Sequence, residues 1–431
     1  MNKAFRNAIR DVFNDGGLII FFLLVPLIYP LLYTFIYTNE TVHEVPVAVV
    51  DADGSSMSRE FLRRLDASPD VKIVSHERSL EEARTRVKHR EAYGVVCIAE
   101  DFTRNIMRME QAHVNLYCDM SGMLYYKAIL SSATDVSLGM NADIKVSRAG
   151  NTTDREDEVT VQPLHYEQTA LFNPQNGFAA FLIPAVLMIV IQQTLLLGVG
   201  MEAGTRRERM ESTRQFPQTE EFTLDDRAMI ETIGNEENGF AKKKHPRSPQ
   251  PHHASRRALR TLLGRSTAFL MIYVPIAVFE MGVVPHLFDL PQIGNAWEIL
   301  AFSLPYLLAC ILFAITLSVL PRNRESVILL VVFSSVPILF LSGVSWPGSA
   351  FPWYWKTLSY LIPSTFGVNG FVRLNTMGAD LSAVRFEYFA LWTQVLLYGL
   401  TAWWVTRKNE LYKIDLKRFY RRWSKTRNKA S

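Results

Sequence analysis

The sequence predicts an α-helical integral membrane protein with six transmembrane helices, a re-entrant segment between the fifth and sixth spans, and an external α/β domain inserted between the first and second spans. Three observations support this fold class. Six stretches are long and apolar enough to cross a bilayer, which takes about 20 residues per helix. The polar region after the first stretch alternates strand and helix patterns. A segment rich in proline, glycine and tryptophan follows the fifth stretch.

The apolar stretches set the expected domain boundaries. They are Gly17–Tyr37, Phe178–Gly200, Leu262–Val284, Trp297–Leu320, Ser326–Ser345 and Phe386–Thr406. The first is too long for a cleavable signal peptide and has no small-residue cleavage site after it, so we expect a retained anchor. The expected divisions are residues 1–37 (N-terminus and first span), 38–177 (external domain), 178–200 (second span), 201–261 (cytoplasmic loop), 262–406 (spans three to six) and 407–431 (basic tail).

Lysine and arginine placement predicts the orientation, because cytoplasmic loops carry an excess of both. The tail after the sixth stretch is strongly basic, and the N-terminal tail carries Lys3, Arg6 and Arg10. The short turn after the fourth stretch carries Arg322 and Arg324, whereas the turn after the third carries no basic residue. Both termini are therefore expected in the cytoplasm. The net charge of +4 follows from this topology and requires no nucleic-acid partner.

The sequence of the external region predicts a compact α/β domain. Expected strands are Val45–Val50, Val71–Ser75, Gly94–Ala99 and Val114–Cys118, and expected helices are Ser56–Leu65, Ser79–His89, Asp101–Met109 and Leu124–Lys145. Ser79 and Glu82 have the spacing of a capping box, and Ser147–Asp157 reads as a loop. Alternating strands and helices predict a small sheet covered by helices.

No catalytic or metal site is expected in this chain. Asp51 and Asp53 follow a strand, but no further carboxylates follow at the spacing of a calcium loop, so a helix-capping turn is predicted. The histidines lack ligand spacing. No Gly-x-x-x-x-Gly-Lys-Ser/Thr loop is present, so the chain has no means of holding ATP phosphates. We therefore expect a non-enzymatic chain with no cofactor of its own.

The cysteines leave one question open. Cys97 and Cys118 fall on strands that could be neighbours, so either a disulfide, favoured outside the cytoplasm, or two free thiols fit the sequence. Cys310 lies in the fourth span, where it is expected to fill space as a small apolar side chain.

The segment from Leu341 to Leu374 is interrupted by prolines and glycines and carries many aromatic residues. Proline and glycine break helices, and broken backbone at membrane depth survives only where protein or water satisfies its polar groups. Tryptophan and tyrosine settle at the bilayer interface. Residues 346–374 are therefore predicted to dip into the outer leaflet as short helices and turn back.

The loop after the second span starts with the charged stretch Met201–Met210. Glu211–Ser255 then loses hydrophobic periodicity and is too polar to fold by itself, so it is expected to be a flexible insertion. Its basic cluster, Lys242–Lys244, could bind either anionic lipid headgroups or a protein partner, and both hypotheses stay open.

With these motifs in view, the chain resembles the permease subunits of type-2 ABC exporters, in the branch with a large external domain after the first span. Glu202-x-Gly204-Thr205 resembles the coupling segment that touches the ATPase. Gly264-Arg265 resembles the Gly-Lys that opens the third span, and Val47–Ser58 resembles the start of the external domain. The family's re-entrant segment is matched by Ser342, Gly343, Pro347, Pro352, Trp353, Tyr360, Pro363 and Gly370. The Glu211–Ser255 insertion departs from the pattern.

The resemblance implies a multi-pass protein of the bacterial cytoplasmic (inner) membrane. It implies a dimer with a second copy or a sister permease, membrane lipids around it, and a separate ATPase subunit that holds ATP and Mg. A periplasmic adaptor would bind the external domain, as in some relatives. The implied ATPase-coupling residues are Glu202, Gly204, Thr205, Arg206 and Arg207.

Polar residues inside the spans are candidate pathway residues, because burying them is costly. Gln192 and Gln193 lie deep in the second span. Glu280, near the outer end of the third span, and Glu298, at the start of the fourth, are close enough to the interface to be hydrated.

Two other classes of membrane protein are alternatives to the exporter. A secondary transporter would ordinarily show internal repeats and several charges at mid-membrane, and the sequence shows neither. A membrane-anchored receptor or scaffold, whose external domain binds a ligand or envelope component, would leave Glu202–Thr205 and the re-entrant segment without a purpose. The sequence does not identify a transported substrate.

Overall fold

A computed structural model describes residues 2–37, 41–150, 153–164, 171–173, 177–215, 251–321 and 323–430. The chain divides into two units, which are described separately. One comprises Met1–Thr38 with Leu171–Ser431, and the other comprises Asn39–Ala170.

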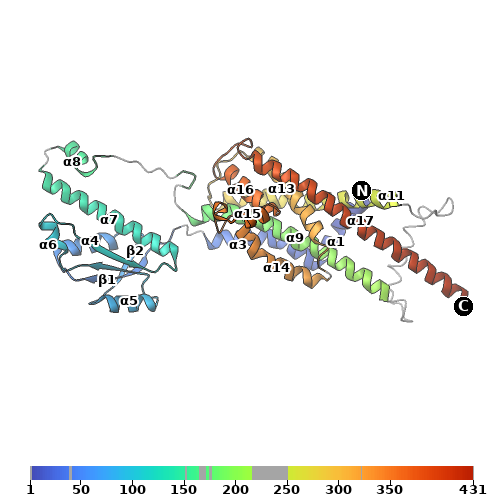
Figure 1. Cartoon of the computed structure of the whole chain (residues 1–431), viewed down its shortest axis with the longest axis horizontal. Helices are drawn as coiled ribbons and strands as arrows, with labels where there is room; N and C mark the ends of the chain where they lie inside the picture. The colour runs from blue at the N-terminus through green and yellow to red at the C-terminus, as the bar shows by residue number, and fades with distance from the viewer. Residues whose placement is uncertain are drawn as a thin grey trace. The chain divides into compact units, whose positions relative to one another are not determined.

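The first unit is a bundle of long helices (Figure 1). Its elements are α1 (Asn2–Asn14), α2 (Gly16–Ile19), η1 (Ile20–Leu24), α3 (Val25–Ile36), α9 (Phe178–Gln215), α11 (Pro251–Val278), η3 (Phe279–Val283), α12 (Val284–Leu287), α13 (Ala296–Leu317), α14 (Arg324–Leu341), η4 (Gly348–Ala350), α15 (Trp353–Ser359), α16 (Pro363–Asn375) and α17 (Arg385–Ala430). The side chain of Asp15 caps α2 by accepting hydrogen bonds from the N–H groups of Gly17 and Leu18.

Five stretches of the described residues are long and apolar enough to cross a membrane, and they fall on the first five predicted spans. They are Gly16–Ile36, Phe178–Arg209, Ser255–Leu287, Ala296–Leu317 and Arg324–Leu341. The sixth predicted span lies within α17, whose tryptophans, tyrosines and polar side chains such as Glu387 and Gln394 lower its mean hydropathy. A sixth crossing therefore stays a prediction.

Helices α9 and α13 form the centre of the bundle. They bury 78% and 72% of their most apolar stretch, against 17% for α14. Helix α9 packs against α13, α14 and α16, while α17 lies along α13 and α11, and α1 packs on α11. The core between them contains large rings: Phe22, Phe269, Tyr273, Phe302 and Tyr306 are all fully buried.

The segment after α14 consists of short helices, as predicted. Gly343 adopts a left-handed backbone conformation (φ +86°) at the end of α14, which glycine tolerates without strain. Helix α16 is largely buried against α9, α13 and α17. A Cβ atom at Gly370 would lie 2.2 Å from the ring of Phe302, so α16 packs close to α13 only because glycine is present. The depth of this segment in a membrane stays a prediction.

The second unit contains a four-stranded sheet in the order β2-β1-β3-β4. The strands are β1 (Val45–Asp51), β2 (Val71–His76), β3 (Gly94–Ile98) and β4 (Val114–Cys118), and all four were predicted. Strand β1 is parallel to β2 and β3, and β4 is antiparallel to β3. The helices of this unit are α4 (Ser56–Asp66), α5 (Leu80–Lys88), α6 (Phe102–Met107), α7 (Met123–Ala149) and α8 (Asp154–Val161).

Helices cover both faces of this sheet. Helices α4, α6 and α7 share one core with its first face, and α5 packs on the other (Figure 1). Ser79 caps α5 as expected, but the side chain of Glu82 accepts a hydrogen bond from Arg78 rather than from Ser79, so only half of the predicted capping box forms.

Two predictions about connecting segments were wrong. Ser147–Asp157 is not a loop throughout: α7 runs to Ala149, and α8 begins at Asp154 because Thr153 and Glu156 form a complete capping box. The predicted insertion also starts too early and ends too late, since Glu211–Gln215 belongs to α9 and Pro251–Ser255 to α11. Its remainder, residues 216–250, lies outside the described residues.

The strand register answers the cysteine question. In the β3–β4 pair, Cys97 lies opposite Asn115 and Cys118 lies opposite Gly94. Successive side chains of a strand point to opposite faces, so the two thiols lie on different faces of the sheet, and both cysteines are free. The structure therefore excludes the disulfide alternative.

Candidate functional site

Charged side chains from α1, α9, α11, the first residue of α14 and the residue before α2 meet at one end of the bundle. At its centre, Glu202 of α9 is only 1% exposed and pairs with Arg265 of α11 and with Arg206 (2.6 Å). Arg206 also pairs with Asp11 of α1 (2.8 Å). A buried charge is tolerated only with such partners, so this ion-pair network fixes three helices to one another.

A second ion pair extends the network to α14. Both terminal nitrogens of Arg324 donate to the carboxylate of Asp15, each at 2.9 Å. Two-pronged pairing of this kind is among the stronger charged contacts. Burial acts to raise the pKa of Asp15, but hydrogen bonds and charge from Arg324, with the N–H groups of Leu18 and Gly17, hold that pKa below its usual value.

The charged end of α9 also holds the turn between α13 and α14. Arg207 donates to the carbonyl oxygens of Ser318 (2.6 Å), Val319 (3.2 Å) and Pro321. Carbonyl groups at a helix end lack partners within the helix, so Arg207 satisfies them. Glu208 accepts a hydrogen bond from the N–H of Arg324 (2.8 Å) at the start of α14. The end of α9 thereby contacts α1, α11, the α13–α14 turn and the start of α14.

Gly204 permits this close packing. A Cβ atom at Gly204 would lie 3.0 Å from the backbone nitrogen of Arg324 and 3.1 Å from its Cα. Any larger residue would therefore push α9 away from the turn. The hydroxyl of Thr205 is buried, with no hydrogen-bond partner among the described residues.

The structure places all five predicted coupling residues together at one end of α9, and their coupling role stays a prediction. The carboxylate of Glu202 lies inside the network, and the exposed side chains at this end of α9 are Glu208 and Arg209. The sequence reading missed Asp11, Asp15 and the pairing of Arg324. The available signal was an acidic residue two positions before the first predicted apolar stretch and an arginine two positions before the fifth.

The glutamines of α9 differ in their surroundings. The side-chain oxygen of Gln192 accepts a hydrogen bond from the N–H of Ser364 (2.7 Å) at the start of α16. The amide of Gln193 is buried without a hydrogen-bond partner among the described residues. Gln192 therefore links α9 to α16.

The two candidate acids also differ. Glu298 accepts a hydrogen bond from the N–H of Leu381 (2.7 Å) and so fixes the connection between α16 and α17. Glu280 is fully buried in the π-helical turn η3, and within the described part of the chain neither of its oxygens has a hydrogen-bond partner. Glu280 was expected to lie close enough to the interface to be hydrated, whereas the structure places its side chain in the packed interior at 0% exposure.

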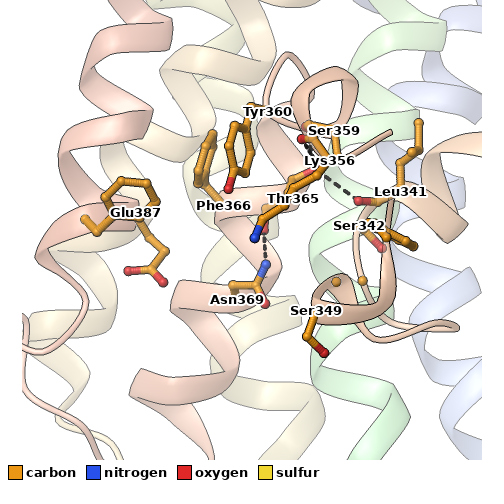
Figure 2. A pocket seen from close by; sticks show the side chains of 14 residues that line it. Leu341, Ser342, Ser349, Lys356, Ser359, Tyr360, Thr365, Phe366, Asn369 and Glu387 are labelled. Atoms are coloured by element: carbon orange, nitrogen blue, oxygen red, sulfur yellow. Dashed lines mark hydrogen bonds between the residues drawn. The ribbon is translucent and has the colours of Figure 1, made fainter. Parts of the chain in front are cut away.

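A cavity of about 350 Å³ lies where the re-entrant segment meets the ends of α14 and α17 (Figure 2). Three predicted re-entrant residues, Ser342, Gly343 and Tyr360, line it, whereas Pro347, Pro352, Trp353, Pro363 and Gly370 do not. Its other lining residues are Leu341, Gly348, Ser349, Phe351, Lys356, Ser359, Thr365, Phe366, Asn369, Phe386 and Glu387. The sequence analysis did not identify the two charged residues of the cavity, Lys356 and Glu387, because a helix and a loop separate them in the chain.

Among the described residues, no cluster of three or more histidine, cysteine, aspartate or glutamate side chains is suited to a metal ion.

The family model described as "ABC-2 family transporter protein" matches residues 17–216 and 253–404. The gap between the two ranges falls within the segment predicted as an insertion. No curated protein matches the chain. Because the matched ranges cover well over half of the sequence and include most of the ion-pair network, the chain belongs to the ABC-2 family of transporter proteins and is a multi-pass transport subunit of a membrane.

Proposed function

We propose that this chain is the permease subunit of an ATP-driven exporter. Its family supports a transport subunit that is not itself catalytic and implies an ABC ATPase partner in general. In the proposal, that separate subunit holds ATP and Mg, and two permeases, either two copies or this chain with a sister permease, form the route for the substrate. The membrane is the bacterial cytoplasmic membrane, with both termini in the cytoplasm and the α/β unit outside.

The ion-pair network carries this proposal. A force applied to the end of α9 reaches α1 through Arg206 and Asp11, α11 through Arg265, and the α13–α14 turn through Arg207. A packed, charge-linked end moves as one body rather than deforming gradually. Closure of the ATPases against this end would therefore tilt several spans together and open the route outward.

The surface of α14 supports the dimer. Its apolar side chains Leu329, Val332, Phe333 and Val336 are 57%, 59%, 77% and 57% exposed. A contiguous apolar face of this kind is suited to lipid or to a second permease.

The α/β unit is proposed to dock a periplasmic adaptor. Cross-linking of this unit in intact cells is expected to recover the adaptor. Recovery of the chain alone would remove the adaptor from the proposal and leave the permease assignment in place.

Affinity purification of the tagged chain in mild detergent tests the proposed function. Mass spectrometry of the eluate is expected to identify an ATP-binding subunit, and the eluate is expected to hydrolyse ATP. The control is the same purification from cells that carry the untagged chain. A chain that purifies alone and without ATP hydrolysis would contradict the proposal and favour a receptor or scaffold.

A further inference from the structure

Two opposite charges face the cavity in Figure 2 without neutralising each other. Lys356 of α15 forms no ion pair with any described residue. Glu387 of α17 pairs with Arg373 through one oxygen (3.1 Å), while its second oxygen is buried and lacks a hydrogen-bond partner among the described residues. The cavity is thus lined by one ammonium group without an ion-pair partner and by one carboxylate whose second oxygen has no hydrogen-bond partner, both among the described residues.

Aromatic rings line the cavity together with the two charged residues. Tyr360 and Phe366 stack with ring centres 5.3 Å apart, and Phe366 contacts Phe386 edge-on at 6.0 Å. Figure 2 shows the rings of Tyr360 and Phe366 beside the side chains of Glu387 and Lys356. The faces of aromatic rings attract cations, so the Glu387 side of the cavity favours a positively charged group.

Hydrogen bonds from side chains to backbone carbonyl oxygens hold the wall of the cavity in place. Thr365 donates to the carbonyl oxygens of Ser359 (2.8 Å) and Leu341 (3.4 Å), and Asn369 donates to that of Thr365 (2.6 Å). The cavity is therefore preformed, and its volume falls near the lower end of the range of small-molecule sites, roughly 300–1,000 Å³.

The position of the cavity indicates an amphiphile. Helix α14 begins at the ion-pair network and ends at the cavity, so the two lie at opposite ends of this helix. The adjoining residues Trp346, Trp353 and Trp355 are 55%, 79% and 47% exposed. Exposed tryptophans settle at the boundary between a bilayer and water, where lipid headgroups lie.

We propose that this cavity binds the zwitterionic headgroup of an amphiphile, with the ammonium group against Glu387 and the aromatic rings and the phosphate against Lys356. A purely cationic headgroup would leave Lys356 facing a like charge, and a purely anionic one would do the same to Glu387. The proposal concerns binding alone, so it stands whether or not the chain exports anything.

Lipid binding to the purified, delipidated full-length chain in a non-ionic detergent tests the proposal. Native mass spectrometry is used to compare phosphatidylethanolamine with phosphatidylglycerol, which carries the phosphate but no ammonium group. Wild-type protein is expected to prefer phosphatidylethanolamine. Lys356→Gln is expected to weaken its binding by about tenfold, the loss of one charged hydrogen bond. Lys88→Gln, in the second unit, is the matched control and is expected to bind like wild type.

Glu387→Gln is expected to abolish the preference for the ammonium headgroup. Because this change also breaks the ion pair with Arg373, Lys356→Gln carries the test if Glu387→Gln fails to fold. A further arm adds soluble glycerophosphoethanolamine. If it competes with the lipid, the cavity recognises the zwitterion itself, and if it does not, the acyl chains contribute.

Equal binding of the two lipids by wild type, or unchanged phosphatidylethanolamine binding by Lys356→Gln, would overturn the proposal.

Discussion

Arg324 joins parts of the sequence that lie far apart. Its guanidinium group donates twice to Asp15, which also caps the first apolar helix, and its backbone N–H donates to Glu208 of α9. A change at Asp15 therefore removes a helix cap and an ion pair together.

We expect Asp15→Asn to lower the free energy of unfolding by about 1 to 2 kcal/mol at neutral pH, since a charged hydrogen-bond pair is lost. Because the pKa of folded Asp15 lies below its ordinary value of 3.8, the stabilisation by its charge is complete above that value and disappears as the pH falls through the folded pKa. The difference between the thermal denaturation midpoints of the two proteins, measured in detergent from pH 7 to pH 3, should therefore shrink toward the acid end. Parallel curves would contradict this account of Asp15.

Gly204 is expected to tolerate no large side chain. In Gly204→Val the added carbon atoms collide with the backbone of Arg324, so the denaturation midpoint should fall. The control is Gly139→Ala in the second unit, where a Cβ atom meets nothing within 4 Å. It should be neutral or stabilise α7 by up to about 1 kcal/mol, because alanine favours helix over glycine. Equal midpoints for the two variants would show that the close approach of α9 to the α13–α14 turn is not formed.

At the scale of elements, α9 organises the bundle. One end carries the ion-pair network, and further along the helix Gln192 holds the first turn of α16. The N–H groups of a first helical turn have no partner within the helix, so the side chain of Gln192 supplies one from outside.

Gln192→Leu should therefore destabilise the bundle. The variant leaves the N–H of Ser364 buried and unpaired, which costs about 1 to 3 kcal/mol. Gln193→Leu is a matched control on the next residue, since its amide has no partner among the described residues to lose. We expect a lower denaturation midpoint for the first variant and little change for the second. The opposite order would contradict the assigned contact.

At the scale of the whole molecule, local patterns predicted most elements. The apolar length of the first five spans and the alternation of β1 to β4 follow from residues close together in the sequence, and these predictions were confirmed. One error arose where a single cap decided the outcome. Thr153 starts α8 inside a stretch whose composition resembles a loop.

The site was predicted less completely than the fold. Glu202 and Gly204 could be selected by resemblance, but the burial of Glu202 depends on Arg265, which is far away in sequence. The cavity charges Lys356 and Glu387 likewise come together only through folding. Such pairs leave no periodic signal, since neither residue constrains its own neighbours in the sequence.

The most direct test of the central claim is a charge-exchange measurement in the purified complex with its ATPase. Glu202→Arg is compared with the double variant Glu202→Arg/Arg265→Glu, which restores opposite charges. Glu110→Arg, an exposed charge reversal in the second unit, is the control.

We expect ATP hydrolysis per purified permease to fall by about tenfold or more in Glu202→Arg, because a buried charge loses its partner. The double variant should recover much of this activity, and Glu110→Arg should retain all of it. Denaturation midpoints are measured alongside, so that loss of fold is separated from loss of coupling. Full hydrolysis by a folded Glu202→Arg permease would contradict the claim that the ion-pair network couples the ATPase to the spans.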